Sequence, residues 1–151
     1  MQVIELLTPS SALCGLEGGS KKRILENIAQ LISDQHDEMD TTCVFNGLHG
    51  REKLGSTGIG DGIAIPHCRL SSCSDAMGYL IKLCEPIDFD AIDKKPVDLL
   101  FVLMVPEDAT SEHLQTLASV AELFSQESTR EALRNCTDSA TLYTTAYGLC
   151  K

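Results

Sequence analysis

The chain has 151 residues, of which 12 are basic and 22 are acidic, so its formal net charge is −10. This charge excludes nucleic-acid binding by a large basic surface. With 43% hydrophobic and 23% charged residues, the composition is that of an ordinary globular protein, and residues 1–151 are expected to form a single domain.

Two helices are predicted in the first third of the chain. The earlier apolar stretch at residues 3–7 contains an acid and follows no basic region, so it does not indicate a secretory signal. Ser20 is expected to cap the first helix, because the apolar residues after it share one helical face: Ile24, Leu25, Ile28, Leu31 and Ile32. The basic first turn, Lys21–Arg23, is either solvated or a contact for a partner. The second helix should begin near Asp40 and fade near Arg51, with an inward face of Val44, Phe45 and Leu48.

The middle of the chain is predicted to supply the strands. Four glycines make residues 54–62 unsuited to the interior of an element, and a short strand at residues 63–65 ends at Pro66. Residues 78–83 and 97–105 have the composition of strands, and the second segment is apolar enough for burial on both faces. Its longest apolar run has seven residues, whereas a membrane-spanning helix needs about 20, so no membrane insertion is expected. Turns, with room for one short strand, should connect these two strands.

Three further helices are predicted toward the C-terminus. Thr110 should cap a long helix whose inward face consists of Leu114, Leu117, Ala118, Ala121 and Phe124. Ser128–Glu131 has the pattern of a capping box for a short helix that reaches Leu133, and Asp138 can cap a last helix that reaches Tyr147. Because helices and strands share one chain without a linker, the expected fold class is α/β, with a mixed β-sheet flanked by α-helices on its faces.

Three side chains have a chemical reason to form an anion site. His67 follows the strand that ends at Pro66, a position where α/β sheets form ligand sites, and a neutral imidazole is a competent nucleophile. His113 lies in the first turn of a predicted helix, whose free N–H groups bind anions. The guanidinium of Arg51 offers a planar fork for phosphoryl oxygens. Each residue alone also fits an ordinary hydrogen-bonded or solvated side chain.

The glycine-rich segment does not indicate a nucleotide site. Residues 58–62 do not fit G-x-G-x-x-G, and the sequence has no G-K-[ST] motif. The glycines instead let the backbone turn closely beside His67, where Ser56 or Thr57 could donate a hydrogen bond to a phosphate.

The seven cysteines are expected to be reduced thiols in the cytoplasm, with a reactive surface thiol as the alternative. They include no C-x-x-C pair, and an odd number cannot close entirely into disulfides within one chain. His67, Cys68 and Cys73 lack the spacing of a zinc site, and the adjacency of Cys68 to His67 argues against a catalytic cysteine–histidine pair. No metal and no cofactor is therefore expected.

Residues 51–67 carry a resemblance to a known family. They read Arg-Glu-Lys-Leu-Gly-Ser-Thr-Gly-Ile-Gly-Asp-Gly-Ile-Ala-Ile-Pro-His, which resembles the active-site segment of the enzyme IIA family of the bacterial phosphotransferase system, fructose/mannitol type. Residues 86–93 and 96–101 are also similar to that family, as is His113-Leu114 followed by Leu117. The version Gly-Ser-Thr-Gly-Ile-Gly-x-Gly-Ile-Ala-Ile-Pro-His is most similar to the nitrogen-regulatory branch.

The resemblance implies a fold, a reaction and partners. The implied fold is an α/β sandwich of the phosphotransferase/anion-transport-like type. His67 would accept a phosphoryl group from the phosphohistidine of a small HPr-like carrier protein, with His113 and Arg51 in the same pocket, as a phosphotransferase component. In the nitrogen-regulatory branch the phosphorylation state decides which target proteins are bound, and transporters and sensor kinases are the candidate targets.

The sequence departs from the family pattern at Cys68, where a glycine commonly follows the histidine. Cys68 is either an oxidation-sensitive switch beside the site or a tolerated small side chain. Two other functions stay open: a sugar-specific IIA component that passes phosphate to a membrane permease, and a binding module that is never phosphorylated.

Overall fold

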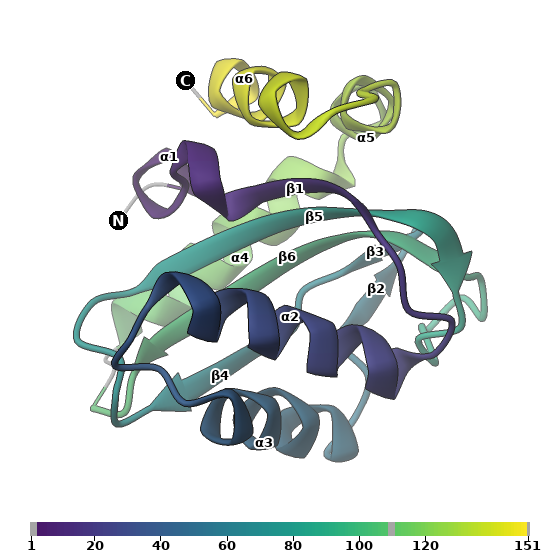
Figure 1. Ribbon diagram of the computed structural model, residues 1–151. Helices are drawn as coiled ribbons and strands as arrows, with labels where there is room; N and C mark the ends of the chain where they lie inside the picture. The colour runs from purple at the N-terminus through teal and green to yellow at the C-terminus, as the bar shows by residue number, and fades with distance from the viewer. Residues whose placement is uncertain (1–2, 109–110, 151) are drawn as a thin grey trace.

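Two long antiparallel strands, β5 and β6, form the centre of a mixed six-stranded sheet in the computed structural model, which describes residues 3–108 and 111–150 (Figure 1). Of residue 4 and residues 111–113 it describes the backbone alone. The sheet order is β1-β5-β6-β3-β2, and β4 also pairs with β6. β1 is parallel to β5, β3 and β4 are parallel to β6, and β2 is antiparallel to β3. The strands are β1 (Ala12–Leu16), β2 (Gly58–Gly60), β3 (Ile63–Ala64), β4 (His67–Leu70), β5 (Met77–Ile87) and β6 (Val97–Pro106).

Helices cover both faces of this sheet, which confirms the predicted α/β class. Figure 1 shows α2 and α3 in front of the sheet and α4 behind it. Alternate residues of a strand point to opposite faces, so Leu100 and Met104 of β6 join the core beneath α2 and α3, while Leu99 and Phe101 join the core beneath α4, α5 and α6. The helical elements are α1 (Val3–Leu6), η1 (Pro9–Ser11, a 3₁₀ turn), α2 (Lys21–Gln35), α3 (Thr41–Lys53), α4 (Ser111–Ser125), α5 (Glu127–Arg134) and α6 (Ser139–Leu149).

The predicted N-caps Ser20 and Asp138, and the predicted start of a helix near Asp40, are confirmed. Ser20 Oγ accepts from the Arg23 backbone N–H at 3.2 Å, and Asp40 Oδ2 accepts from Cys43 N–H at 3.1 Å. Asp138 caps α6 in the same way. A side-chain oxygen at this position satisfies one of the free N–H groups of the first turn, and a cap is worth about 1 kcal/mol. The starts of α2, α3 and α6 are therefore fixed by local chemistry.

The predicted inward face of α4 is confirmed at Phe124 and, in part, at Leu117 and Ala121, and is wrong at Leu114 and Ala118. Leu114 is 64% exposed and Ala118 is exposed, whereas Val120 and Phe124 are buried. Phe124 packs edge-on against Phe101 of β6, with 6.2 Å between ring centres, and this contact sets the rotation of the helix. Leu117 and Ala121 are partly buried, as residues at the border of that face. Thr110, the predicted cap, lies outside the described residues.

The capping box predicted for Ser128–Glu131 is also wrong. α5 begins at Glu127, and its N-cap Gln126 makes no side-chain capping bond. Arg130 instead donates from Nη1 to the carbonyls of Phe124 and Ser125, at 3.0 and 2.9 Å. The Arg130 side chain thus joins α5 to α4, because it satisfies carbonyl groups that the C-terminal end of α4 leaves free.

Four of the six strands differ from the predictions. β1 and β4 were not predicted, and β2 lies inside the glycine-rich segment that was expected to be irregular. β5 continues through Pro86 to Ile87, which pairs with Val97, where a turn was expected. β1 pairs with β5 only as far as Leu83, so Pro86 lies beyond that pairing, where a missing N–H costs little.

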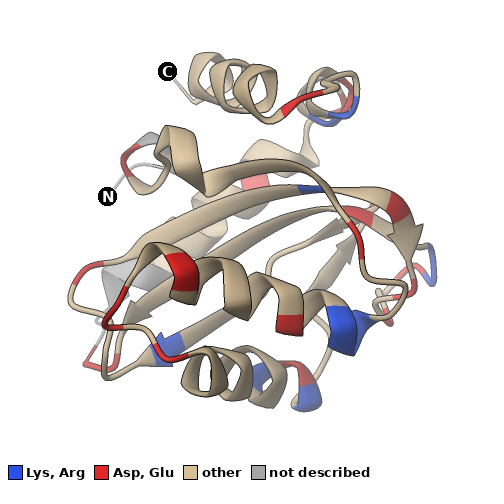
Figure 2. Ribbon diagram, in the orientation of Figure 1, with Lys and Arg blue, Asp and Glu red and all other residues tan. Residues whose placement is uncertain are grey.

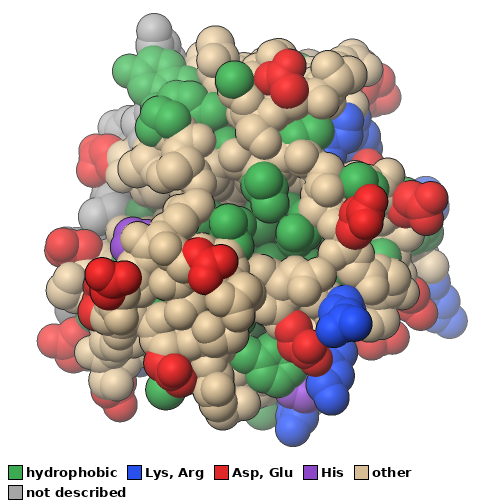
Figure 3. Space-filling view, viewed as in Figure 1, with side chains coloured by type: hydrophobic (Ala, Val, Ile, Leu, Met, Phe, Trp, Pro, Cys, Tyr) green, Lys and Arg blue, Asp and Glu red, His purple; other side chains and the backbone are tan. Residues whose placement is uncertain are grey.

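Charged groups are concentrated in loops and at helix ends (Figure 2). Basic side chains occur both at the N-terminal end of α2 and at the C-terminal end of α3, and these two ends lie together at one side of the helical layer. Figure 3 shows hydrophobic side chains at the bottom of a hollow between β1 and α2 on the same face. Within the described part of the chain, no helix is long and apolar enough to cross a membrane.

Candidate active site

His67 opens β4, and hydrogen bonds on both ring nitrogens define its state. Its Nδ1 lies 2.7 Å from the carbonyl oxygen of Ile65, and its Nε2 lies 3.2 Å from Nε of Arg51. A carbonyl oxygen can only accept and a guanidinium N–H can only donate. The proton of the neutral ring is therefore on Nδ1, and the lone pair is on Nε2, which faces Arg51.

The surroundings of His67 favour the uncharged ring. Burial lowers the pKa of His67 below its usual 6.5, and the positive charge of Arg51 lowers it further, against the opposing effects of the Ile65 carbonyl and the Glu52 charge. Desolvation penalises the charged form of the imidazole, and a neighbouring cation does the same. Near pH 7 the ring is thus neutral and carries a free electron pair at Nε2, which is the state required of a nitrogen nucleophile.

Arg51 lies in the last turn of α3 and joins this helix to the glycine-rich segment. Besides facing His67, it donates from Nη1 to the carbonyl of Gly55 at 2.9 Å. A guanidinium has five N–H donors, so N–H groups remain for a ligand once these two bonds are made. The structure therefore brings together two of the predicted residues, His67 and Arg51, and places a cation directly at the unprotonated ring nitrogen.

Glu52 was not identified from the sequence, yet it is the most deeply placed charged group next to the site. Its side chain is 2% exposed and forms an ion pair with Lys21, whose Nζ lies 2.8 Å from Oε2. Both carboxylate oxygens accept from the backbone N–H of Thr57, at 3.3 and 3.2 Å, and one also accepts from the Thr57 hydroxyl. One signal could have found it, because Glu52 follows the buried Val44 and Leu48 at steps of four residues on α3.

Ser56 and Thr57 hold the glycine-rich segment in place. The Ser56 hydroxyl donates to the Phe89 carbonyl at 2.6 Å and accepts from the Gly58 N–H at 3.0 Å. The Thr57 hydroxyl donates to Glu52. Direct phosphate binding by either hydroxyl, as predicted, would require these hydrogen bonds to rearrange. His113 lies in the first turn of α4, and its side chain is outside the described part of the structure.

Cys68 follows His67 in β4, and adjacent residues of a strand point to opposite faces of the sheet. Its side chain therefore points away from the candidate site. It is buried in the core beneath α2 and α3, where a side-chain carbon added at Gly47 would lie 3.1 Å from its Sγ. Burial raises the pKa of Cys68 to about 12, so the thiol is protonated and a poor nucleophile near pH 7. This arrangement favours the alternative of a small packed side chain over an oxidation-sensitive switch.

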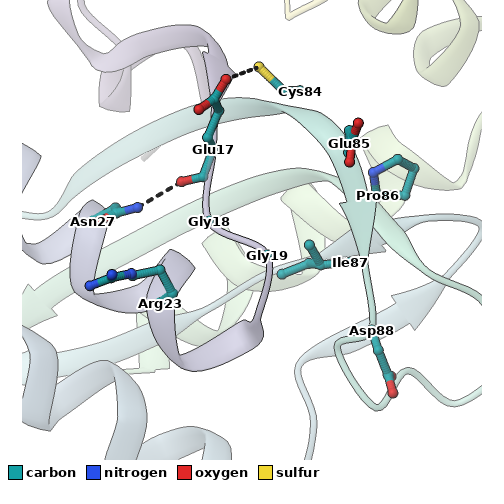
Figure 4. A pocket seen from close by; sticks show the side chains of 10 residues that line it. All are labelled: Glu17, Gly18, Gly19, Arg23, Asn27, Cys84, Glu85, Pro86, Ile87 and Asp88. Atoms are coloured by element: carbon teal, nitrogen blue, oxygen red, sulfur yellow. Dashed lines mark hydrogen bonds between the residues drawn. The ribbon is translucent and has the colours of Figure 1, made fainter.

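A cleft of about 700 Å³ is lined by neither His67 nor Arg51. It lies between the β1–α2 connection and the end of β5, with Glu17, Glu85 and Asp88 on its wall (Figure 4). Two of its polar side chains have partners: Asn27 donates to the Glu17 carbonyl at 2.7 Å, and Arg23 lies 3.7 Å from Glu26. Nor do the described residues contain a group of three or more His, Cys, Asp or Glu side chains that could hold a metal ion.

The chain is similar to known proteins both in sequence and in structure. Residues 5–146 match the family described as phosphoenolpyruvate-dependent sugar phosphotransferase system, EIIA 2. A nitrogen regulatory protein of Pseudomonas aeruginosa is 50% identical over 139 residues, which are 92% of this chain and 90% of the relative. One from Escherichia coli K12 is 46% identical over 125 residues, 82% of this chain and 76% of that protein. The crystal structure of nitrogen regulatory protein IIA-Ntr from Neisseria meningitidis matches with a TM-score of 0.87 and 43% identity, and covers 95% of this chain and 97% of its own.

Proposed function

Because the chain belongs to the EIIA 2 family of the phosphoenolpyruvate-dependent sugar phosphotransferase system, and within it to the nitrogen regulatory proteins, we propose that His67 accepts a phosphoryl group at Nε2. The donor is the phosphohistidine of a small HPr-like carrier protein. The resemblance carried by residues 51–67 is confirmed at the level of the family. The single observation that supports the proposal for this residue is the pair of hydrogen bonds that leaves the Nε2 lone pair facing Arg51.

In this reaction the Nε2 lone pair attacks phosphorus in line with the bond that breaks. A new N–P bond forms at His67 while the N–P bond of the carrier breaks, and that electron pair returns to the carrier's imidazole. The ring of His67 gains positive charge, which the Ile65 carbonyl stabilises through the Nδ1–H it already accepts. The N–H of Arg51 leaves the lone pair and turns to the phosphoryl oxygens, where a guanidinium stabilises the developing negative charge.

The phosphorylated and unphosphorylated forms would present different surfaces to target proteins. A phosphoryl group adds negative charge and strong hydrogen-bond acceptors, at a site where the free protein presents a guanidinium and a neutral ring. We therefore assign the chain a regulatory role in the cytoplasm, with transporters or sensor kinases as candidate targets. This role is supported by the names of the relatives, which are nitrogen regulatory proteins.

Intact mass after incubation with a phosphorylated HPr-like carrier tests the proposal. The wild-type chain should gain one phosphate, His67→Ala should gain none, and His113→Ala should gain it more slowly. His49→Ala is a matched control, because His49 is a partly exposed histidine on α3, stacked against Phe45 at 5.0 Å, and should behave like the wild type. A phosphate retained in His67→Ala would overturn the assignment.

A further inference from the structure

A buried ion pair joins the first turn of α2 to the last turn of α3. Lys21 lies 2.8 Å from Glu52, and the two side chains are 19% and 2% exposed. Lys21 also lies 3.6 Å from Asp90 and 4.9 Å from the centre of the Phe89 ring. A cation in the first turn of a helix opposes the helix dipole. The position of Lys21 is thus explained by what it contacts, not by the helix that carries it.

A chain of hydrogen bonds leads from Glu52 to His67. Glu52 holds the backbone N–H and the hydroxyl of Thr57. The Thr57 carbonyl accepts from the Ile65 N–H at 3.0 Å, and the Ile65 carbonyl accepts from Nδ1 of His67 at 2.7 Å. The last of these bonds selects the tautomer of His67. Its geometry depends on Thr57, and Thr57 is held by Glu52.

The pairing of Lys21 with Glu52 also prevents Glu52 from competing for Arg51. Arg51 and Glu52 are adjacent in α3, and a buried carboxylate without a cation attracts any guanidinium within reach. With Lys21 bound to Glu52, Arg51 instead keeps Nε on His67 and Nη1 on Gly55. The ion pair therefore leaves the charge of Arg51 available at the nucleophilic nitrogen.

We propose that Glu52, neutralised by Lys21, is a positioning residue for phosphoryl transfer at His67. Glu52 fixes the Nε2 lone pair through Thr57 and Ile65, and its pairing with Lys21 leaves Arg51 free to bind the phosphoryl group. The inference rests on the proposed function of His67. Neither Lys21 nor Glu52 touches the reacting atoms, since both act through the backbone and through charge.

The first test compares two lysines on the same helical turn. Lys21→Met removes the cation from Glu52, and Lys22→Met removes an equal charge from an exposed position. Transfer is measured in a single turnover at saturating phosphorylated HPr-like carrier and normalised to the folded fraction. Lys21→Met should slow transfer about 10–100-fold, since displacement of reacting groups by about 1 Å costs this much. Its Kd for the carrier should stay the same, and Lys22→Met should transfer at the wild-type rate.

The second test is a spectroscopic signature that needs no phosphorylation. Nitrogen-15 NMR of the imidazole should show the His67 proton on Nδ1 in the wild type and in Lys22→Met, and a mixture of tautomers in Lys21→Met. If Lys21→Met does not fold, the double variant Lys21→Met/Glu52→Met replaces it. That variant buries no unpaired charge but deprives Thr57 of its acceptor, so it should show the same mixture and the same slow transfer.

The possible results separate the two proposals. Suppose that folded Lys21→Met, or the double variant, transfers at the wild-type rate and keeps the His67 tautomer unchanged. The ion pair would then only support the fold, and this result would overturn the inference. A wild-type chain that accepts no phosphate would overturn the proposed function instead, while the NMR signature still reports whether Glu52 positions His67. Slow transfer with mixed tautomers supports both proposals.

Discussion

Two arginines, one on each side of the sheet, are used in opposite ways. Arg134 of α5 makes a bidentate pair with the Asp98 carboxylate, with Nε and Nη2 each at 2.9 Å from an oxygen, and it also donates to the Asp61 carbonyl. Its charge is fully compensated. Arg51 of α3 faces a neutral imidazole and a backbone carbonyl, and among the side chains that the structure describes no carboxylate pairs with it.

The carboxylate nearest to Arg51 in the sequence explains the difference. Glu52 could have paired with Arg51, but Lys21 occupies it at 2.8 Å. A guanidinium paired with a carboxylate fastens two elements together, whereas one beside a neutral base retains its attraction for an incoming anion. The comparison teaches that what distinguishes the candidate site from a structural contact is which cations are paired with carboxylates, more than how many cations are present.

Replacing each arginine in turn tests this distinction between the two residues most strongly. Arg51→Met should slow phosphoryl transfer about 100-fold, the typical cost of deleting one donor to developing negative charge, with little change in stability. Arg134→Met should lower the free energy of unfolding by about 1–2 kcal/mol through the loss of charged hydrogen bonds and leave the transfer rate unchanged. Single-turnover transfer and urea denaturation measure the two effects. Equal slowing by both variants would contradict the distinction.

The pH dependence of transfer should show that His67 is neutral. Its pKa is lowered, mainly by burial and also by Arg51, so the rate should be level above pH 6.5 and fall only below it, as the ring protonates. Because the unfolded chain has the ordinary pKa near 6.5 and binds the proton first, this group lowers stability as pH falls from about 6.5 toward the folded pKa. In Arg51→Met the midpoint should move upward. NMR titration of His67 measures both midpoints, and a midpoint above 6.5 in the wild type would contradict the assignment.

The smallest expected effect is on the labelling of two cysteines that differ in burial. Cys43 is exposed, and Cys68 is buried with a pKa raised to about 12 by that burial. Iodoacetamide near pH 7 should label Cys43 readily and Cys68 hardly at all, in phosphorylated and unphosphorylated protein alike, because the thiolate is the reactive form. Peptide mass spectrometry follows each site. Rapid labelling of Cys68 that stops on phosphorylation would restore it as part of the site.

The elements that were predicted correctly are those whose signals are local. Ser20, Asp40 and Asp138 cap helices with their own side chains, and the continuous apolar run in β6 reflects burial on both faces. The rotation of α4, which exposes Leu114 and buries Val120, depends on the contact of this helix with the sheet, made by residues that are far apart in the sequence. β4 is four residues long, and its strand geometry comes from pairing with β6. Neither contact leaves a periodic pattern in the chain.

The candidate site was predictable to the same extent. His67 and Arg51 could be identified from residue chemistry and from the family resemblance, and the structure brings them together. The basic turn that contains Lys21 was interpreted as solvated or as a partner contact, and Glu52 was not identified, since a charged residue at a helix end is ordinarily exposed. Their burial results from the packing of α2 on α3, which a single sequence does not encode locally.

Phosphorus-31 and proton NMR of the phosphorylated protein test most directly whether Nε2 of His67 is the acceptor. Both ring carbons bonded to Nε2 carry hydrogen, whereas only one of those bonded to Nδ1 does. The account predicts that phosphorus couples to both ring protons of His67. Coupling to one ring proton only, or a phosphate on another residue, would contradict it.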